Sequence, residues 1–247
     1  MSEQTPSWGI EPVPDRLRVL GAFDHFLLWC SLGVSLLVIV VGALLVPALS
    51  LRDAIVAIVL GGIVGNLMLA AAGLIGADGR VPGMVLMRAP LGRVGSYVPT
   101  VLNALQCWGW ATFELIIIAA AASALSDDLF GVGAKWAWTL VFGAVAATLA
   151  LVGPVSVVRR FIRRFAAWVV LASLAYLTWW SLAEADFSKL WHARPEGGIS
   201  VWIGMDLVIA ITVSWAPLIP DYTRFSRDRR AAFTGAGLGY FVAGTWM

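Results

Sequence analysis

Long apolar segments separated by short polar ones make up the pattern of this 247-residue chain. Six of them fall near or above the ~20 residues that a helix needs to cross the hydrocarbon core of a bilayer. The pattern therefore predicts six spanning helices and a seventh apolar segment that is shorter than a full span. The predicted spans are residues 26–49, 51–75, 97–125, 136–152, 165–182 and 199–220, and the incomplete seventh is 231–247.

Composition assigns these segments to a membrane rather than to a soluble core. Hydrophobic residues make up 60% of the chain and charged residues 13%, with a mean hydropathy of +0.85, whereas soluble domains carry about 25% charged residues. The fold class expected is all-α, a multi-pass helical membrane protein. Residues 1–25 form a polar amino-terminal tail without a signal-peptide pattern, and residues 183–198 form a polar loop between the fifth and sixth spans.

The distribution of Lys and Arg predicts the orientation. Thirteen basic residues fall on the side of the amino terminus and four on the other side. Such a bias places the amino terminus in the cytoplasm, with residues 183–198 outside, in a cell (inner) membrane. The net charge of +2 gives no reason to expect a nucleic-acid partner. The basic residues on the inner side are Arg16, Arg18, Arg80, Arg88, Arg93, Arg159, Arg160, Arg163, Arg164, Arg224, Arg227, Arg229 and Arg230.

The third span carries a carboxylate in its apolar middle. At about 100° per residue, Asn103, Gln106, Cys107, Trp110 and Glu114 fall within one narrow arc of a helix. A charge near the bilayer centre costs at least ~2.5–3.5 kcal/mol, so such a residue normally faces a protein interior, a partner or a water-filled cavity. Glu114 is therefore the first candidate site residue. The alternative is a protonated Glu114 that joins neighbouring helices by a hydrogen bond.

Small residues interrupt the first and second spans. Gly33 and Ser35 lie in the middle of the first, where they permit either close helix packing or a locally unwound segment. In an unwound segment, freed carbonyl groups can hold a cation at membrane depth. The second span has Gly61 and Gly65 on one face, which we interpret mainly as packing positions.

The sixth span contains a proline together with polar and aromatic residues. Pro217 removes an intrahelical hydrogen bond and should kink or break the helix. Thr212 and Trp215 lie beside that position, and a broken helix flanked by such residues is typical of a midplane binding site in a secondary transporter. An ordinary kink with an interfacial Trp is the alternative.

Enzyme chemistry is not indicated. The intramembrane ionisable groups are few and dispersed, without paired carboxylates, a His cluster or a Ser beside a base. The two cysteines, Cys30 and Cys107, lie in apolar segments and have no metal-ligand spacing. We therefore expect no catalytic residue, no metal and no cofactor.

Three motifs resemble one transporter family. They are GRVPGMVLMRAPLGRVGSYVP from Gly79, NALQCWGWATFEL from Asn103, and IPDYTRF from Ile219 to Phe225. Their order and spacing are similar to those of the nucleobase:cation symporter-1 family, which includes cytosine, purine, hydantoin and allantoin permeases. The resemblance covers nearly the whole chain.

The resemblance implies a fold and a set of site residues. Members are similar to five-plus-five inverted-repeat transporters, so residues 26–182 would be the first repeat and residues 199–247 the truncated start of the second. In the family, the third-span tryptophan stacks on the heterocycle and the residue four positions later hydrogen-bonds it; these are Trp110 and Glu114 here. A second family tryptophan falls at Thr212, one helical turn before Trp215. The resemblance implies half of a cation site around Gly33 and Ser35.

The predicted function is the import of a nucleobase or related aminopyrimidine by symport with H+ or Na+. A carboxylate such as Glu114 accepts two hydrogen bonds and matches an amino group beside a ring N–H. This favours cytosine, a purine such as adenine, or hydroxymethylpyrimidine over uracil or hydantoin. The alternative for a chain of this length is an inactive fragment or an assembly subunit without transport of its own. The sequence does not predict the oligomeric state.

Overall fold

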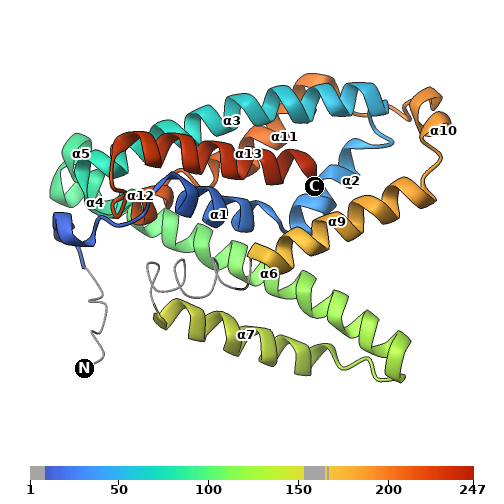
Figure 1. Cartoon of the computed structure of the whole chain (residues 1–247), viewed down its shortest axis with the longest axis horizontal. Coiled ribbons are helices and arrows are strands. Elements are labelled where there is room, and N and C mark those ends of the chain that lie inside the picture. The colour runs from blue at the N-terminus through green and yellow to red at the C-terminus, as the bar shows by residue number, and fades with distance from the viewer. Residues whose placement is uncertain (1–8, 153–164, 166) are drawn as a thin grey trace.

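The computed structural model of the chain describes residues 9–152, 165 and 167–247 (Figure 1). Within these residues the fold is all-α, and the only β-type pairing is an isolated bridge between Leu20 and Ser226. The predicted fold class is therefore confirmed. The arginine run at 159–164, which contributes to the predicted orientation, lies outside the described residues.

The long helices coincide with the predicted apolar segments. They are α1 (Ala22–Gly33) with α2 (Leu36–Leu45), α3 (Leu51–Gly79), α6 (Tyr97–Phe130), α7 (Lys135–Val152), α9 (Ala167–Glu184), α11 (Val201–Val213) with α12 (Ile219–Thr223), and α13 (Ala236–Trp246). Shorter elements are the 3-10 turn η1 (Asp15–Leu17), α4 (Gly83–Leu86), α5 (Arg88–Gly95), α10 (Phe187–His192) and the π-type turn η3 (Ala231–Gly235).

Two helices among the described residues, α3 and α6, are long and apolar enough to cross a membrane. The bent pair α1–α2 counts as a third if it forms one span, whereas α7 and α11 are apolar but shorter. These lengths agree with a multi-pass membrane protein. The full set of six spans and the boundaries of the two repeats stay predictions.

The segment at 79–96, between the predicted second and third spans, contains two short helices, α4 and α5. Pro82 is held in an extended conformation at the start of α4, and the Gly83 N–H that follows donates to the Asp221 carboxylate at 3.0 Å. That contact satisfies one of the open donors at the helix end. Gly92, with φ of 70°, interrupts α5, because glycine adopts this backbone region without steric cost.

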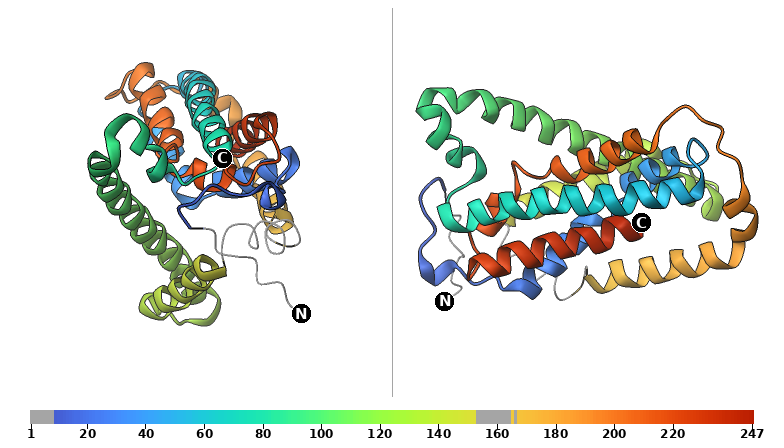
Figure 2. Two further views of the ribbon diagram at one scale, coloured as in Figure 1. Left: turned by 90° about the vertical axis from the view of Figure 1, so that its left-hand side faces the viewer. Right: turned by 90° about the horizontal axis from the view of Figure 1, so that it is seen from above.

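The core joins helices from the two ends of the chain. In both Figure 1 and Figure 2, α3 runs alongside α11 and α13, and α1 lies against α13. Glycines allow the close approach: a Cβ added at Gly61 would lie 2.8 Å from the Met205 carbonyl oxygen on α11, and one at Gly65 would lie 2.9 Å from the Thr212 Cβ. The packing interpretation of the second-span glycines is confirmed.

Helices α6 and α7 pack on each other and extend away from this core (Figure 1). Only 11% of the most apolar stretch of α6 is buried, against 44% for α3. The third span therefore meets the core along one narrow face, which is the face that carries its polar residues.

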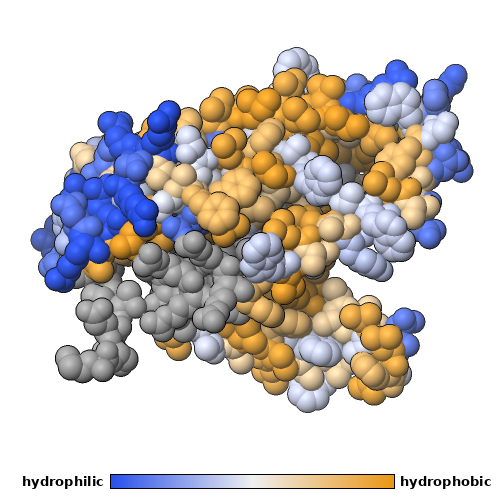
Figure 3. Space-filling view, in the orientation of Figure 1, coloured by the Kyte–Doolittle hydropathy of each residue, from blue (hydrophilic) through white to orange (hydrophobic). Residues whose placement is uncertain are grey.

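Polar side chains gather at opposite ends of the molecule, with an apolar belt between them (Figure 3). One end contains η1, α4, α5 and α12, and the other contains α10 and the turn between α6 and α7 (Figure 1). Segments 9–21, 80–96 and 221–230, which the sequence assigns to the cytoplasm, thus share one end. Residues 183–198 lie at the other end.

Candidate functional site

The first span is broken at its centre. Helix α1 ends at Gly33, α2 begins at Leu36, and the two axes are bent by 61°. Val34 and Ser35 between them are extended, and the Ser35 Oγ accepts a 3.0 Å hydrogen bond from the Leu37 N–H. Serine is a favoured helix N-cap because it satisfies such a donor. The structure therefore shows the unwound segment that the sequence left open.

Gly33 also packs closely, so the second interpretation of this position holds as well. A Cβ added at Gly33 would lie 2.9 Å from the Ala243 Cβ on α13. The break in the first span is thus held directly against the last helix of the chain.

Glu114 reaches this break from the third span. The Ser35 Oγ donates to the Glu114 Oε1 at 2.6 Å, in addition to capping α2. Both side chains are only partly buried. A short hydrogen bond from a hydroxyl to a carboxylate is of the strong, charge-assisted kind, so Oε1 is occupied and Oε2 is the oxygen that a ligand could use.

The sixth span is broken as Pro217 predicted. Helix α11 ends at Val213, and α12 begins at Ile219 after a stretch of turns. The Gln106 Nε2 on α6 donates to the Ser214 carbonyl oxygen in this break at 2.6 Å. The polar arc of α6 therefore contacts both interruptions, through Glu114 at the first and Gln106 at the second.

Trp110 lies between these two contacts on α6, four residues from Gln106 and four from Glu114. At about 100° per residue, a spacing of four places them on the same face. The Trp110 side chain is 37% exposed, and no described ring pair includes it. An open indole beside a carboxylate is an arrangement that can stack a flat ring and bind its polar edge.

Trp215 belongs to an aromatic cluster rather than to a pair with Trp110. Its ring meets the fully buried Trp29 of α1 edge to face, with centroids 5.8 Å apart. Two tyrosines extend the cluster: Tyr240 of α13 lies 6.1 Å from Trp29 and 6.4 Å from Trp215, and Tyr222 of α12 lies 5.9 Å from Trp29.

Thr212 lies on a different face from these groups. It is 4% exposed, its Oγ1 donates to the Val208 carbonyl oxygen at 3.1 Å, and it packs on Gly65 of α3. Its proposed role in substrate binding stays a prediction, since the structure brings together Ser35 and Glu114 but places Thr212 against the second span.

Sequence reasoning did not identify Trp29 and Tyr240 as part of this region. Trp29 is four residues before Gly33 and so shares its helix face, which is a signal that could have identified it. Tyr240 lies in the last apolar segment, and its proximity to Trp215 depends on how α13 packs on α1.

The site combines two interrupted membrane helices with the polar face of α6, which contacts both breaks. This arrangement is that of a multi-pass membrane protein with a central polar region. A family described as permease for cytosine/purines, uracil, thiamine, allantoin matches residues 12–247. The chain belongs to this family, and the resemblance drawn from its motifs is confirmed.

Comparison with one relative shows how much of a longer protein the chain covers. The hydantoin permease of Microbacterium maritypicum is 25% identical to the chain over 203 residues. The match takes in 82% of this chain and 41% of that permease. The chain therefore spans less than half the length of this relative.

Proposed function

We propose that the chain is the amino-terminal part of a secondary transporter that imports a nucleobase or related aminopyrimidine together with H+ or Na+. Family membership supports transport rather than enzyme chemistry. The contact between Ser35 and Glu114 carries the proposal, because it places the third-span carboxylate at the break of the first span.

The proposed ligand stacks on the open indole of Trp110 and presents its polar edge to Glu114. Base–aromatic stacking contributes about 1–3 kcal/mol per base. With Oε1 engaged by Ser35, Oε2 is the oxygen that accepts the exocyclic amino group of the base. Cytosine, adenine and hydroxymethylpyrimidine offer an amino group of this kind, whereas uracil and hydantoin do not.

Coupling to a cation is assigned to the same break. The backbone is extended at Val34 and Ser35. The Ser35 carbonyl oxygen accepts the Val38 N–H of α2 at 3.1 Å, so the carbonyl groups proposed for an ion are those at the end of α1, where helical partners are missing. Such segments can coordinate ions at membrane depth. Gly33 and Ser35 are therefore proposed as half of a cation site. Glu114 is the corresponding candidate if the coupling ion is H+, because its carboxylate can carry a proton.

The open surface of α6 favours the alternative for the isolated 247-residue chain. With 11% of its apolar stretch buried, the third span has a large face that further helices could cover. The chain by itself would then be an inactive fragment or an assembly subunit.

Uptake of radiolabelled cytosine or adenine tests these possibilities in cells that express the 247-residue chain or the same chain with its native downstream sequence. Accumulation that depends on a proton or sodium gradient in the longer form alone supports the proposal. Accumulation by the 247-residue chain without a partner would show that its own helices complete the site, and none in either form would refute transport of these bases.

A further inference from the structure

The segment ahead of α1, residues 9–21, is tied to two regions that are distant in sequence. On one side the Val13 N–H donates to the Arg80 carbonyl oxygen at 2.9 Å, just beyond the end of α3. On the other side the Leu20 N–H donates to the Phe225 carbonyl oxygen at 3.0 Å, and the Arg227 N–H donates to the Leu20 carbonyl oxygen at 2.9 Å. We call residues 9–21 the amino-terminal clasp.

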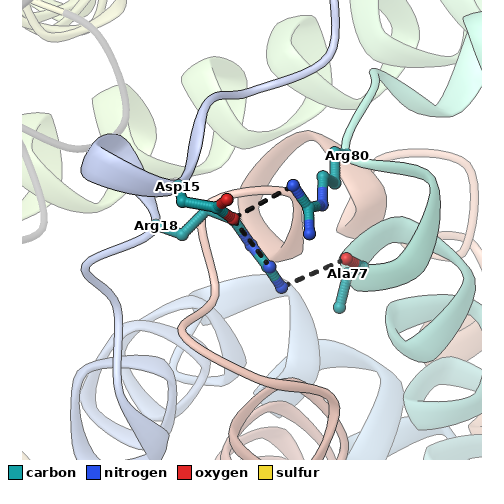
Figure 4. A network of polar contacts seen from close by, with 4 residues as sticks. All are labelled: Asp15, Arg18, Ala77 and Arg80. Carbon is teal, nitrogen blue, oxygen red and sulfur yellow. Dashed lines mark hydrogen bonds and ion pairs between the residues drawn. The ribbon is translucent and has the colours of Figure 1, made fainter.

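Charged side chains reinforce the contact with α3. Figure 4 shows Asp15 between two arginines: its Oδ1 lies 3.0 Å from the Arg80 Nη1 and 3.5 Å from the Arg18 Nη1. The Arg18 Nη2 also donates to the Ala77 carbonyl oxygen at 3.4 Å. Asp15 therefore links the clasp to the last turn of α3, and because its side chain is 79% exposed it can be changed without disturbing the core.

Two arginines that follow α12 hold the clasp from the opposite side. The Arg224 Nη1 donates to the Gly9 carbonyl oxygen at 2.8 Å, and the Arg227 Nε donates to the Val19 carbonyl oxygen at 3.1 Å. These bonds reach the two ends of the clasp. Arg224 lies in the IPDYTRF motif, so the structure gives this motif a role in binding the clasp.

The clasp is anchored by buried side chains as well. Val13 and Leu20 are each 1% exposed and belong to the same core cluster as Trp29, Ile219 and Phe225. Trp29 is a member of the aromatic cluster at the breaks. The clasp is therefore part of the same packed core as Trp29, next to the candidate site.

The position of α12 depends on these contacts. Helix α12 follows the break in the sixth span and packs on α3 at Gly73, where an added Cβ would lie 3.0 Å from the Ile219 Cδ1. Movement of α12 away from α3 would separate Arg80 from residues 224–227, and the clasp bridges both. We propose that the amino-terminal clasp locks α12 to α3 and keeps this end of the protein closed, and that its release opens the end. The proposal rests on the proposed function, since transport requires such an opening.

Thiol labelling tests the lock without any substrate. Thr223 is completely buried on α12 against Gly73 and Gly76 of α3, so Thr223→Cys should react slowly with a thiol reagent applied to this end, in a Cys30→Ala, Cys107→Ala background. Asp15→Arg should raise the labelling rate about two- to fivefold, the range expected for loss of a partly exposed ion pair. Exposed Ser188→Cys at the opposite end is the control and should be unaffected.

A charge exchange separates the lock from a general loss of stability. In Asp15→Arg/Arg80→Asp the pair is restored with reversed signs, and Asp tolerates the positive φ of 59° at position 80. The labelling rate of the thiol introduced by Thr223→Cys should return toward that of the parent. An unchanged rate in Asp15→Arg, or an increased rate that the exchange does not reverse, would overturn the proposed role of the ion pair.

A cross-link tests the consequence for transport. Leu20 and Ser226 are paired in the parallel bridge, and adjacent backbone pairs of this kind fall in the range of Cα separation that a disulfide needs. In full-length protein, oxidation of Leu20→Cys/Ser226→Cys should abolish uptake and a reductant should restore it, whereas each single variant should be insensitive to oxidant. Uptake that continues when the cross-link is complete would contradict the lock. If the unoxidised protein takes up no base but labelling of the Thr223→Cys variant responds as expected, the proposed function fails and the clasp remains supported.

Discussion

The Ser35 hydroxyl donates a 2.6 Å hydrogen bond to the Glu114 carboxylate, and so joins the break in the first span to the middle of the third. The same hydroxyl accepts the Leu37 N–H that begins α2. One side chain therefore fixes both the geometry of the break and the orientation of the carboxylate. A change at either residue should affect the other.

Substitution at Ser35 tests this double role. Ser35→Ala removes the cap of α2, which should cost about 0.5–2 kcal/mol of stability, and it frees the Glu114 Oε1. Ser35→Thr retains the hydroxyl and should keep both contacts. We expect a lower unfolding temperature in detergent and weaker base binding for the Ala variant only. Equal behaviour of the two variants would show that the hydroxyl does not position Glu114.

Trp110→Ala should remove the stacking surface while leaving expression intact. Loss of about 1–3 kcal/mol of stacking corresponds to a roughly 5- to 150-fold weaker affinity for the base, measured by binding or uptake in the full-length protein. Trp108→Ala is the matched control, because Trp108 is 73% exposed and lies two residues away on another face of α6. Unchanged affinity in Trp110→Ala would show that the third span does not supply the stacking platform.

The sequence predicted the features of the site that depend on the residues of a single segment. The polar arc of α6 follows from helical periodicity, and the break at Pro217 follows from the missing N–H of proline. At Gly33 and Ser35 the sequence left two interpretations open, and the structure shows that both apply. The glycine face of α3 was also predictable, because small residues at helical spacing permit close packing.

Features that depend on contacts between distant segments could not be predicted. Trp29, Trp215 and Tyr240 come from three different segments, and nothing in any one of them specifies their meeting. The identity of Thr212 as a threonine does not show whether its side chain faces the site or α3. Similarly, the sequence of residues 9–21 is short and mixes charged with apolar residues, and only the structure shows Val13 buried among core residues.

Substitution of two glycines by alanine should have opposite effects on stability, because one glycine lies in the close contact of α3 with α11 and the other lies on the open surface of α6. Gly61→Ala would place a Cβ 2.8 Å from the Met205 carbonyl oxygen, so the helices must separate, which should cost about 1–3 kcal/mol. Gly109→Ala on α6 meets no atom within 4 Å and should stabilise by up to about 1 kcal/mol, since alanine is the better helix former. Thermal unfolding of the two variants in one detergent tests the pair, and equal effects would contradict the packing.

The charge bias of the sequence, together with the common end shared by the basic segments, predicts an amino terminus on the cytoplasmic side of the membrane. Ser188→Cys, in the segment after α9, should then react with an impermeant thiol reagent added to intact cells. Reaction only after permeabilisation would reverse the orientation. Thr234→Cys, in η3 on the other side, provides the complementary control.

Glu114→Gln tests the central claim, that the third-span carboxylate recognises an aminated base, and competition binding in the full-length protein is the direct measurement. Affinity for cytosine and adenine should fall by about 1–3 kcal/mol, the usual cost of losing a buried hydrogen bond to a charged group. Uracil and hypoxanthine should lose less, because the glutamine amide can donate to their carbonyl groups. Glu184→Gln, at the exposed end of α9, should leave all four unchanged.

A different result for Glu114→Gln would reassign the residue. Loss of pH dependence of uptake for all bases equally would identify Glu114 as a proton carrier and not as the group that selects the base. The predicted result is selective weakening of the amino bases relative to the oxo bases. The result that contradicts the account is an unchanged affinity for every base, which would leave Glu114 as a structural hydrogen-bond partner of Ser35.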